Sequence, residues 1–321
     1  MKIVIALPLT EAQKQSFLDA SQGNEIVFKD CGDVSGSVLT LGAITEEDVK
    51  DADAIIGNAP LKVVRQASKL KWMQLSSAGS DAYDKPNALP NNALLTAASG
   101  AYGVAVSEHL LACILSLKKG LHLYRDNMTN KVWRDEGHIT SIVGSVSLIL
   151  GTGDIGTELA FRLKALGGTV YGVRRSASVP KEPFDKIFSI NDIPAILPQV
   201  DILASVMPGD PSLTNLIGKA EFAAMKDSAI FVNAGRGNIV DQDALCEALT
   251  TGEIFGAAID VAVKEPLPQD DPLWNCRNLI ITPHVAGQFH LQLTVDKIAA
   301  IALENMKRWL NGEDLVNVRN R

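Results

Sequence analysis

A glycine-rich turn between an apolar strand and a helix is the feature that most constrains the fold of this chain. The segment VSLILGTGDIGTELAFRLKALGGTVYGV sets Gly151, Gly153 and Gly156 in the pattern GxGxxG, directly after a fully apolar run. The first glycine permits a tight turn, the second lets a pyrophosphate approach the backbone, and the third lets helix and strand pack closely. The pattern predicts a strand–helix–strand unit that holds a dinucleotide on the N–H groups at the helix start.

Strand-like apolar segments alternate with helix-like segments along the whole chain, in two series. The first hundred residues contain KIVIAL, NEIVFKD, ADAIIGN, KWMQLSS and ALLTAA. The second series runs through VSLILG, TVYGVRR, KIFS, VDILASVM, AIFVNAG, GAAIDVAV and LIITPHV. Such alternation is typical of parallel sheets with helices on both faces. The predicted fold class is therefore α/β, with two doubly wound parallel-sheet domains.

Two helical segments define the expected domain boundaries. Residues 101–128 are mostly helix-compatible, end in a cationic, polar turn region, and predict one long helix that crosses between the domains. Near the end of the chain, LQLTVDKIAAIALENMKRWLNG has helical apolar spacing and a stop signal at Gly312, which predicts a helix that returns to the first domain. We assign residues 1–100 and 286–321 to a first, flavodoxin-like domain, and residues 101–285 to a dinucleotide-binding (Rossmann) domain.

Composition excludes several classes of protein. The net charge of −7, without a basic run to offset it, argues against nucleic acid as a partner. No apolar run reaches the ~18 residues needed to cross a bilayer, so no membrane association and a cytoplasmic location are expected. The cysteines show no CxxC pairing and are interpreted as buried apolar residues, with neither a disulfide framework nor a metal site. They are Cys31, Cys113, Cys246 and Cys276.

The tip of the second Rossmann strand carries two arginines where an acid is common. Arg174 lies 18 residues after Gly156, and it is followed by Arg175 and Ser176. An Asp or Glu there would bind a ribose 2′-hydroxyl, whereas guanidinium groups suit a 2′-phosphate. A charge-assisted contact of this kind contributes about 1.5–3 kcal/mol. Because no acid is evident near the tip, NADP(H) is the expected cofactor, with NAD(H) as the alternative; solvated surface arginines are the other interpretation.

Three further motifs place chemically active side chains just after apolar strands. FVNAGRGNIVD contains Arg236, IDVAVKEPLP contains Glu265, and LIITPHVAG contains His284. Ligands of α/β sheets gather at the carboxyl ends of strands. An arginine fork can grip a carboxylate, and a histidine can donate or accept a proton. Each residue alone has an ordinary structural interpretation, but the set predicts one catalytic site.

These motifs, in this order behind GTGDIG, resemble those of the D-isomer-specific 2-hydroxyacid dehydrogenase family. LSSAGSDAYD at 75–84 is similar to the family's substrate loop, VSEHLLACILSL to its inter-domain helix, and MPGDPSLTNLIG to its cofactor-side loop. The likeness covers residues 100–290 closely and the first hundred residues more loosely. It implies that Arg236 binds the substrate carboxylate and that His284, held by Glu265, is the acid/base.

The resemblance also implies a wider set of contacts. Backbone donors of the substrate loop would bind the carboxylate, from Ser77, Ala78 and Gly79. Asp154 and Ile155 would cover the pyrophosphate, Pro208 and Thr214 would line the cofactor, and Asp260 would reach the nicotinamide amide. No metal site is implied.

The activity expected from the resemblance is NADPH-dependent reduction of a small 2-keto acid, such as glyoxylate or hydroxypyruvate, to the D-2-hydroxy acid. A homodimer built on the nucleotide domain, with the segment around 101–145 at the interface, is also implied. Oxidation of 3-phosphoglycerate ranks lower because LSSAGSDAYD has no Lys or Arg. A cofactor-sensing binding protein on the same fold, similar to a co-repressor, is the alternative from another class.

Overall fold

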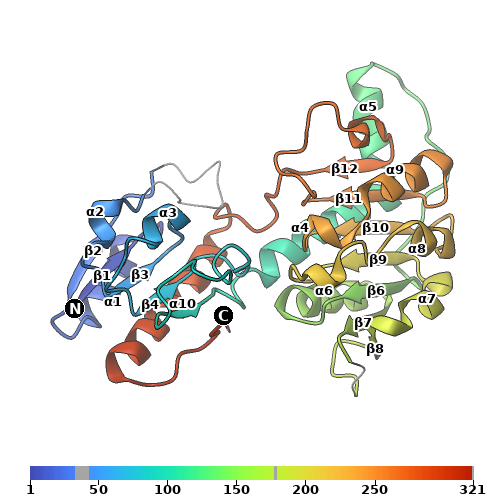
Figure 1. Ribbon diagram of the computed structural model, residues 1–321. Coiled ribbons are helices and arrows are strands. Elements are labelled where there is room, and N and C mark those ends of the chain that lie inside the picture. Colours follow the sequence, from blue (N-terminus) through green and yellow to red (C-terminus); the bar gives the residue numbers. More distant parts are fainter. Residues whose placement is uncertain (33–42, 177–178, 320–321) are drawn as a thin grey trace. The chain divides into compact units, whose positions relative to one another are not determined.

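The chain divides into two compact units, each built on one parallel sheet (Figure 1). The computed structural model describes residues 1–32, 43–176 and 179–319. Unit 1 combines Met1–Tyr102 with Gly287–Arg321, and unit 2 spans Gly103–Ala286. The junctions expected from the sequence lie at 100/101 and 285/286. The predicted α/β class with two parallel-sheet domains is confirmed.

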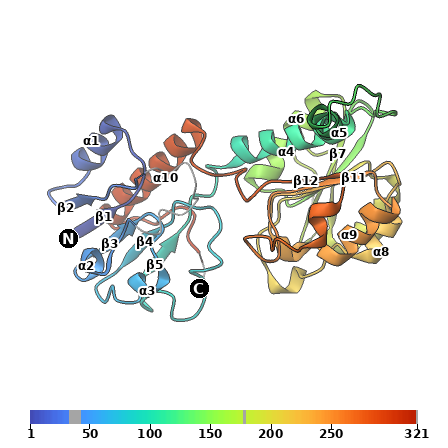
Figure 2. The ribbon, with the colours of Figure 1, turned by 90° about the horizontal axis from the view of Figure 1, so that it is seen from above.

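Unit 1 has five parallel strands in the order β2-β1-β3-β4-β5. Its strands are β1 Lys2–Ile5, β2 Glu25–Phe28, β3 Ala54–Ile56, β4 Trp72–Gln74 and β5 Leu94–Thr96. Its helices are α1 Glu11–Asp19, α2 Glu46–Val49, α3 Leu61–Val64 and α10 Gln292–Asn311. Figure 2 shows α1 and α10 on one face of the sheet and α2 and α3 on the other. The central strands are largely buried on both faces, which explains why they are mainly apolar.

The predicted C-terminal helix is confirmed as α10, and it packs against β4. The rings of Trp72 and Trp309 lie 5.5 Å apart between centroids. Asn305, which is fully buried, donates from Nδ2 to Oε1 of Gln74 over 2.8 Å. Gly312 ends the helix with φ of +72°, a conformation that glycine adopts without strain. The end of the chain is thereby returned to the sheet of unit 1.

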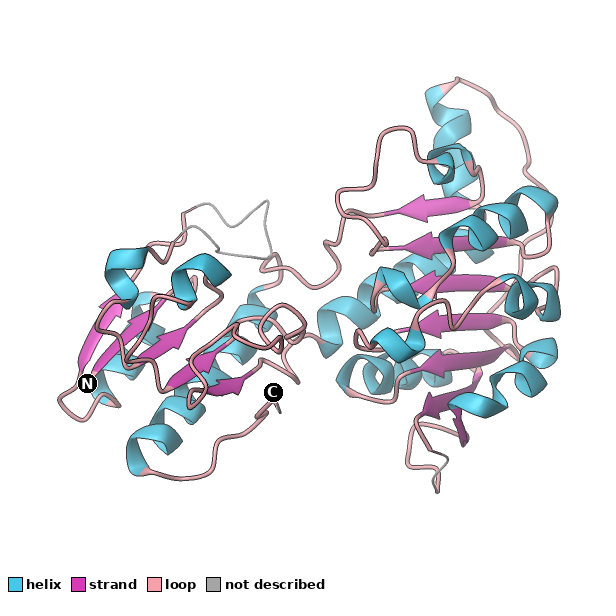
Figure 3. Cartoon of the chain, viewed as in Figure 1, coloured by secondary structure: helices cyan, strands magenta, loops and turns pink. Residues whose placement is uncertain are grey.

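Unit 2 has seven parallel strands in the order β12-β11-β10-β9-β6-β7-β8, seen as a stack of arrows in Figure 3. The strands are β6 Val146–Leu150, β7 Thr169–Arg174, β8 Lys186–Ser189, β9 Ile202–Ser205, β10 Ile230–Asn233, β11 Gly256–Ile259 and β12 Leu279–Ile281. The helices are α4 Gly103–Lys118, α5 Leu121–Thr129, α6 Asp154–Ala165, α7 Ile193–Ile196, α8 Lys219–Ala224 and α9 Gln242–Thr251. In Figure 2, α4, α5 and α6 cover one face and α8 and α9 the other. Because β6 lies between β7 and β9, its carboxyl end is the switch point where such sheets bind ligands.

The single long helix expected over 101–128 is wrong. The segment forms α4 and α5, which are separated at Lys119 and Gly120. Gly120 has φ of +64°, in the left-handed region, and this breaks the helical path. The basic residues Lys118 and Lys119 followed by glycine are a helix stop signal that the apolar pattern obscures.

The cysteines differ from the expectation in one respect. Only Cys113 is buried, whereas the other three are half-buried, and all four are free thiols. Cys246 and Cys276, distant in sequence, bring their Sγ atoms to 3.5 Å. Burial and the hydrogen bond with Cys246 raise the pKa of Cys276 to about 11. Within the described ranges, no three His, Cys, Asp or Glu side chains are grouped to hold a metal ion.

No helix in the described ranges combines the length and the apolar character that a membrane crossing requires.

Candidate active site

The glycine loop after β6 is shaped by contacts that a side chain would obstruct. Gly151 has φ of +104°, and a Cβ there would lie 3.2 Å from the carbonyl oxygen of Val206. A Cβ on Gly156 would collide with the carbonyl oxygen of Gly151, so only glycine lets α6 pack this closely. A Cβ on Gly153 would meet no atom within 4 Å, which leaves its backbone open to a ligand. This arrangement fits a pyrophosphate group.

Asp154 and Ile155 are the first two residues of α6, in the turn whose N–H groups have no partner within the helix. Asp154 is exposed and Ile155 is half-buried. Helix α4 packs so tightly here that a Cβ on Gly103 would lie 2.6 Å from Oδ1 of Asp154. The loop is therefore fixed from the side of α4 as well as by its own glycines.

The two arginines lie at the carboxyl end of β7, beside the glycine loop. The N–H of Gly151 donates to the carbonyl oxygen of Val173 over 2.9 Å. Arg174 is exposed, and it forms no ion pair with any residue that the structure describes. Arg175 places Nη2 at 3.2 Å from Oδ2 of Asp210, but its side chain is 87% exposed, so the pair is weak. Ser176 is exposed directly after them.

Asp210 corrects the expectation that no acid lies near the tip of β7. The loop after β9 brings this residue to Arg175, although the two are 35 positions apart in the sequence. Oδ1 of Asp210 accepts from Oγ and N of Ser212 over 2.7 and 2.9 Å. These hydrogen bonds, with Arg175 as a smaller contributor, hold the pKa of Asp210 below its usual value. The acid is thus engaged by the chain itself on both oxygens.

Pro208 and Thr214, in the same loop, are exposed. The amide of Asn238, in the loop after β10, donates to Oγ1 of Thr214 over 3.2 Å and to the carbonyl oxygen of Asp210 over 3.4 Å. The loops that follow β9 and β10 therefore support each other beside the glycine loop.

The loop that carries Arg236 is held from within by Asn233, a fully buried residue at the end of β10. Asn233 accepts from the N–H of Gly235 over 3.0 Å and donates to the carbonyl oxygen of Arg236 over 3.0 Å. A Cβ on Gly235 would lie 2.6 Å from the carbonyl oxygen of Met207. Arg236 itself is half-buried, and its Nη1 donates to the carbonyl oxygen of Gly235 over 2.8 Å. Its guanidinium is thus attached to a rigid turn.

His284 and Glu265 form a hydrogen-bonded pair. Nδ1 of His284 lies 2.8 Å from Oε2 of Glu265, and both side chains are partly exposed. Oε1 of Glu265 accepts from the N–H of Ala262 over 3.0 Å, which fixes the carboxylate. Because a carboxylate accepts hydrogen bonds, this contact places a proton on Nδ1 of the ring.

Asp260 orders the turn on which His284 lies. The residue is 5% exposed, and its carboxylate accepts from Oγ1 of Thr282 over 2.6 Å and from the N–H groups of Val285 and Ala286 over 2.9 and 3.1 Å. On the same side, Nε2 of His109 in α4 lies 3.1 Å from Oγ1 of Thr282. The turn of His284, which has φ of +55°, is therefore supported by a partly buried network of Asp260, Thr282 and His109.

In unit 1, the loop Ser77–Gly79 follows β4 and turns its carbonyl groups toward the protein. The carbonyl oxygen of Ser77 accepts from the N–H of Ala98 over 2.9 Å, that of Ala78 from Nη2 of Arg319 over 3.0 Å, and that of Gly79 from Oγ of Ser77 over 2.7 Å. No described residue accepts from the N–H groups of these three residues. Three successive N–H groups are thus left without an acceptor among the described residues, and such donors suit an anion.

Two buried side chains fix the entry to this loop. Oδ1 of Asn58, which is fully buried, accepts from the N–H of Ser76 over 3.0 Å, and its Nδ2 donates to Oγ of Ser77 over 3.2 Å. The hydroxyl of Tyr102 donates to the carbonyl oxygen of Ser76 over 2.6 Å. Tyr102 therefore helps to fix this loop. Trp133, another large aromatic residue, belongs to unit 2 and is fully exposed.

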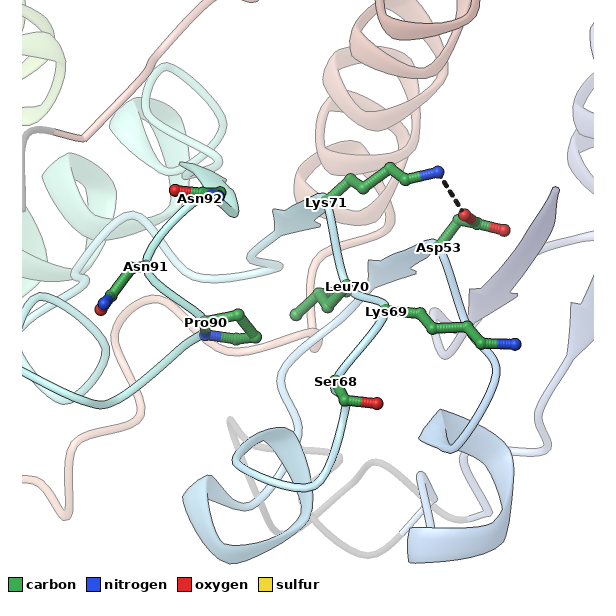
Figure 4. A pocket seen from close by; sticks show the side chains of 8 residues that line it. All are labelled: Asp53, Ser68, Lys69, Leu70, Lys71, Pro90, Asn91 and Asn92. Carbon is green, nitrogen blue, oxygen red and sulfur yellow. Dashed lines mark hydrogen bonds and ion pairs between the residues drawn. The ribbon is translucent and has the colours of Figure 1, made fainter.

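A pocket in unit 1 lies at the amino ends of the strands, opposite the end that carries the loop Ser77–Gly79 (Figure 4). Asp53 and Lys71 come just before β3 and β4, at the amino ends of the strands, whereas the loop Ser77–Gly79 follows a carboxyl end. Nζ of Lys71 pairs with Oδ1 of Asp53 over 2.8 Å, as the dashed line shows. The pocket contains none of the residues expected in the active site.

Comparison with known proteins places these features in a family. Residues 111–286 match the family model described as D-isomer specific 2-hydroxyacid dehydrogenase, NAD binding domain. The chain belongs to this family. It is 33% identical over 260 residues to a putative 2-hydroxyacid dehydrogenase of Haemophilus influenzae, covering 75% of this chain and 80% of that protein. It is 32% identical over 260 residues to glyoxylate/hydroxypyruvate reductase B of Enterobacter sp., covering 78% of each.

A solved structure of the 2-hydroxyacid dehydrogenase family agrees with the fold of the whole chain. The family protein from Aeromonas salmonicida superposes with a TM-score of 0.83 at 30% identity, covering 99% of both chains. The resemblance inferred from the sequence motifs is therefore confirmed. As a member of this family, the protein is an oxidoreductase that uses a nicotinamide dinucleotide and acts on small 2-hydroxy or 2-keto acids.

The structure also reveals supporting residues that the sequence motifs do not indicate. Asn58, His109, Asn233 and Arg319 each hold a loop that carries an expected site residue. A polar side chain within an apolar strand run, such as Asn233 in IFVN, is the one local signal among them. The others act on residues far away in the sequence, so no local pattern identifies them.

Proposed function

We propose that the protein reduces a small 2-keto acid to the D-2-hydroxy acid with NADPH. The proposal depends on the His284–Glu265 pair, whose Nδ1 and Oε2 atoms lie 2.8 Å apart. The turn that carries His284 is held by a hydrogen bond from the N–H of Val285 to Asp260. Such a pair provides an oriented proton donor beside a strand end. When bound, the reduced nicotinamide supplies a hydride to the carbonyl carbon.

The residues of the chain would supply the remaining chemistry. Nε2 of His284 donates a proton to the carbonyl oxygen as the hydride arrives, and Glu265 balances the charge on the imidazole. The guanidinium of Arg236 binds the carboxylate next to the reacting carbonyl group and so orients it. The N–H groups of Ser77–Gly79 are donors of the kind that bind the same carboxylate. In the oxidative direction, His284 accepts the proton.

The cofactor contacts are proposed on the same basis. The open backbone at Gly153 and the first turn of α6, with Asp154 and Ile155, would hold the pyrophosphate. Exposed Pro208 and Thr214 would flank the dinucleotide, and Asp260 would reach the nicotinamide amide in addition to ordering its turn.

A preference for NADPH rests on the arginines at the end of β7. The unpaired guanidinium of Arg174 would take most of the charge of a 2′-phosphate, because Asp210 already neutralises part of Arg175. Ser176 adds a hydroxyl donor. A homodimer is proposed on the exposed apolar side chains of α5 and the segment after it, which include Met128, Trp133 and Val143.

Steady-state kinetics with His284→Ala tests the proposal. The wild-type protein should reduce glyoxylate, hydroxypyruvate, pyruvate or a branched keto acid with NADPH. The variant should lose about 10²–10⁴-fold in kcat, as expected when a general acid is removed. His290→Ala is the matched control, since His290 is exposed and belongs to no part of the pair. Near-full activity in His284→Ala would contradict the assignment, and no turnover with any of these acids would favour a binding role.

A further inference from the structure

The end of the chain adds a short extended segment to the sheet of unit 1. Val318 pairs with Thr96 in an antiparallel bridge beside β5. The N–H of Arg319 donates to the carbonyl oxygen of Leu95 over 2.8 Å, and the carbonyl oxygen of Asn317 accepts from the N–H of Ala97 over 3.2 Å. The backbone of Arg319 is therefore fixed by the sheet.

From this position the side chain of Arg319 reaches the loop Ser77–Gly79. Its Nη2 donates to the carbonyl oxygen of Ala78 over 3.0 Å and to the hydroxyl of Ser99. The contact with Ala78 joins residues that are 241 positions apart in the sequence. Arg319 thus holds the carbonyl group of Ala78, the middle one of three residues whose N–H groups have no acceptor in the described part of the chain.

The charge of Arg319 has no counter-ion among the residues of unit 1 that the structure describes. The guanidinium forms no ion pair with any carboxylate in the described part of the chain, and its Nε is buried without a hydrogen-bond partner. A partly buried charge that is not paired is unfavourable unless an anion lies nearby. The free N–H groups of the loop and this unpaired guanidinium therefore favour the same kind of ligand.

We propose that Arg319 is a positioning residue that sets the affinity of the loop Ser77–Gly79 for the carboxylate of the 2-keto acid. It holds the loop through the carbonyl group of Ala78, and its positive charge attracts the anion. The inference rests on the proposed function, because that function assigns the carboxylate to this loop. Arg319 does not touch the reacting carbonyl group, so it acts on binding rather than on proton or hydride transfer.

The test compares Arg319→Met with wild type in two measurements. Steady-state kinetics should show KM for glyoxylate raised tenfold or more, with kcat within about twofold and KM for NADPH unchanged. This split is expected when an interaction binds ground state and transition state equally. Isothermal titration with oxalate, a carboxylate that is not reduced, should show a similar rise in Kd at saturating NADPH.

Two further variants make the test specific. Arg319→Lys keeps the charge but loses the planar fork, so its KM should lie between those of wild type and Arg319→Met. If Arg319→Met does not fold, an unchanged KM for glyoxylate in Arg319→Lys contradicts the inference and a raised KM supports it. Arg65→Met is the matched control, because Nε of Arg65 also donates to a loop carbonyl group of unit 1, that of Asn87, over 3.3 Å. Its KM and Kd should equal those of wild type.

The outcomes separate this inference from the proposed function. Turnover by wild type with unchanged KM and Kd in both Arg319 variants would leave the reductase standing and overturn the role of Arg319. Oxalate binding that depends on Arg319, without turnover of any keto acid, would support the inference and contradict the reductase. An effect of equal size on KM for NADPH, or in Arg65→Met, would indicate general destabilisation and overturn the inference.

Discussion

The glycine loop of unit 2 and the loop Ser77–Gly79 of unit 1 both follow a parallel strand, and both leave backbone N–H groups without an acceptor among the described residues. The glycine loop achieves this within six residues, through a helix start and the close contact between Gly151 and Gly156. The loop of unit 1 has no helix behind it. Its carbonyl groups are held back by Ala98, by Arg319 and by a serine of its own.

The two loops differ in where the residues that fix their conformation lie in the sequence. Those of the glycine loop are within the loop, whereas most of those that hold Ser77–Gly79 are distant. A loop fixed by glycines fails through steric collision, since an added Cβ has no space. A loop fixed by distant side chains fails gradually, as each hydrogen bond is removed. Substitutions in the glycine loop should therefore have large, steric effects, whereas those around Ser77–Gly79 should have smaller effects that accumulate.

The largest effect is expected from glycine substitutions in unit 2. Gly156→Ala should lower the melting temperature by roughly 5–10 °C or prevent folding, because overpacking by a methyl group costs about 1–3 kcal/mol. Gly153→Ala, where the methyl group meets no atom within 4 Å, should melt like wild type without cofactor but bind NADPH at least tenfold more weakly. Thermal melts with and without NADPH measure both. Normal NADPH binding by Gly153→Ala would show that the pyrophosphate lies elsewhere.

A smaller effect is expected at the tip of β7. Arg174→Ala should reduce the ratio of kcat/KM for NADPH over NADH by about tenfold, the value of one charge-assisted contact. Arg175→Ala, the matched variant, should reduce it by about threefold or less, because Asp210 already takes part of that charge. Kinetics with both cofactors at one keto acid concentration give the ratios. A larger loss in Arg175→Ala than in Arg174→Ala would reverse the assignment.

The smallest effect is expected from the support of the loop in unit 1. Asn58→Ala leaves the N–H of Ser76 unpaired and removes one donor from Oγ of Ser77, so KM for the keto acid should rise about fivefold. KM for NADPH should stay constant. Asn24→Ala, in the same unit but remote from this loop in the sheet order, serves as the control in the same assay. A collapse in kcat instead of a rise in KM would indicate that the loop takes part in the chemistry.

Much of the cofactor side was predictable because its signals are local. The GxGxxG pattern, the arginines of β7 and the strand-end residues Arg236, Glu265 and His284 lie within short motifs. The contact of Glu265 with His284, which the family resemblance implies, is present in the structure.

Two features of the structure differ from what the sequence predicts, and each difference has a physical reason. The sequence does not reveal that Asp210 lies near Arg175. The loop after β9 brings the two together from 35 positions apart, and such a contact leaves no local pattern. The break between α4 and α5 was missed because the apolar spacing continues through Gly120, although a glycine after two lysines is a local stop signal. Asn58 and Arg319 act over long separations, which only the folded sheet of unit 1 reveals.

The discontinuous composition of unit 1 has a consequence for the order of events during protein synthesis. Its sheet is made first, but α10 and the segment at Arg319 follow only after the roughly 180 residues of unit 2. At the usual ~5–20 residues per second, this delay is about 10–40 s. During that time unit 2 can fold on the ribosome, while the face of the first sheet that α10 later covers stays exposed to water and chaperones.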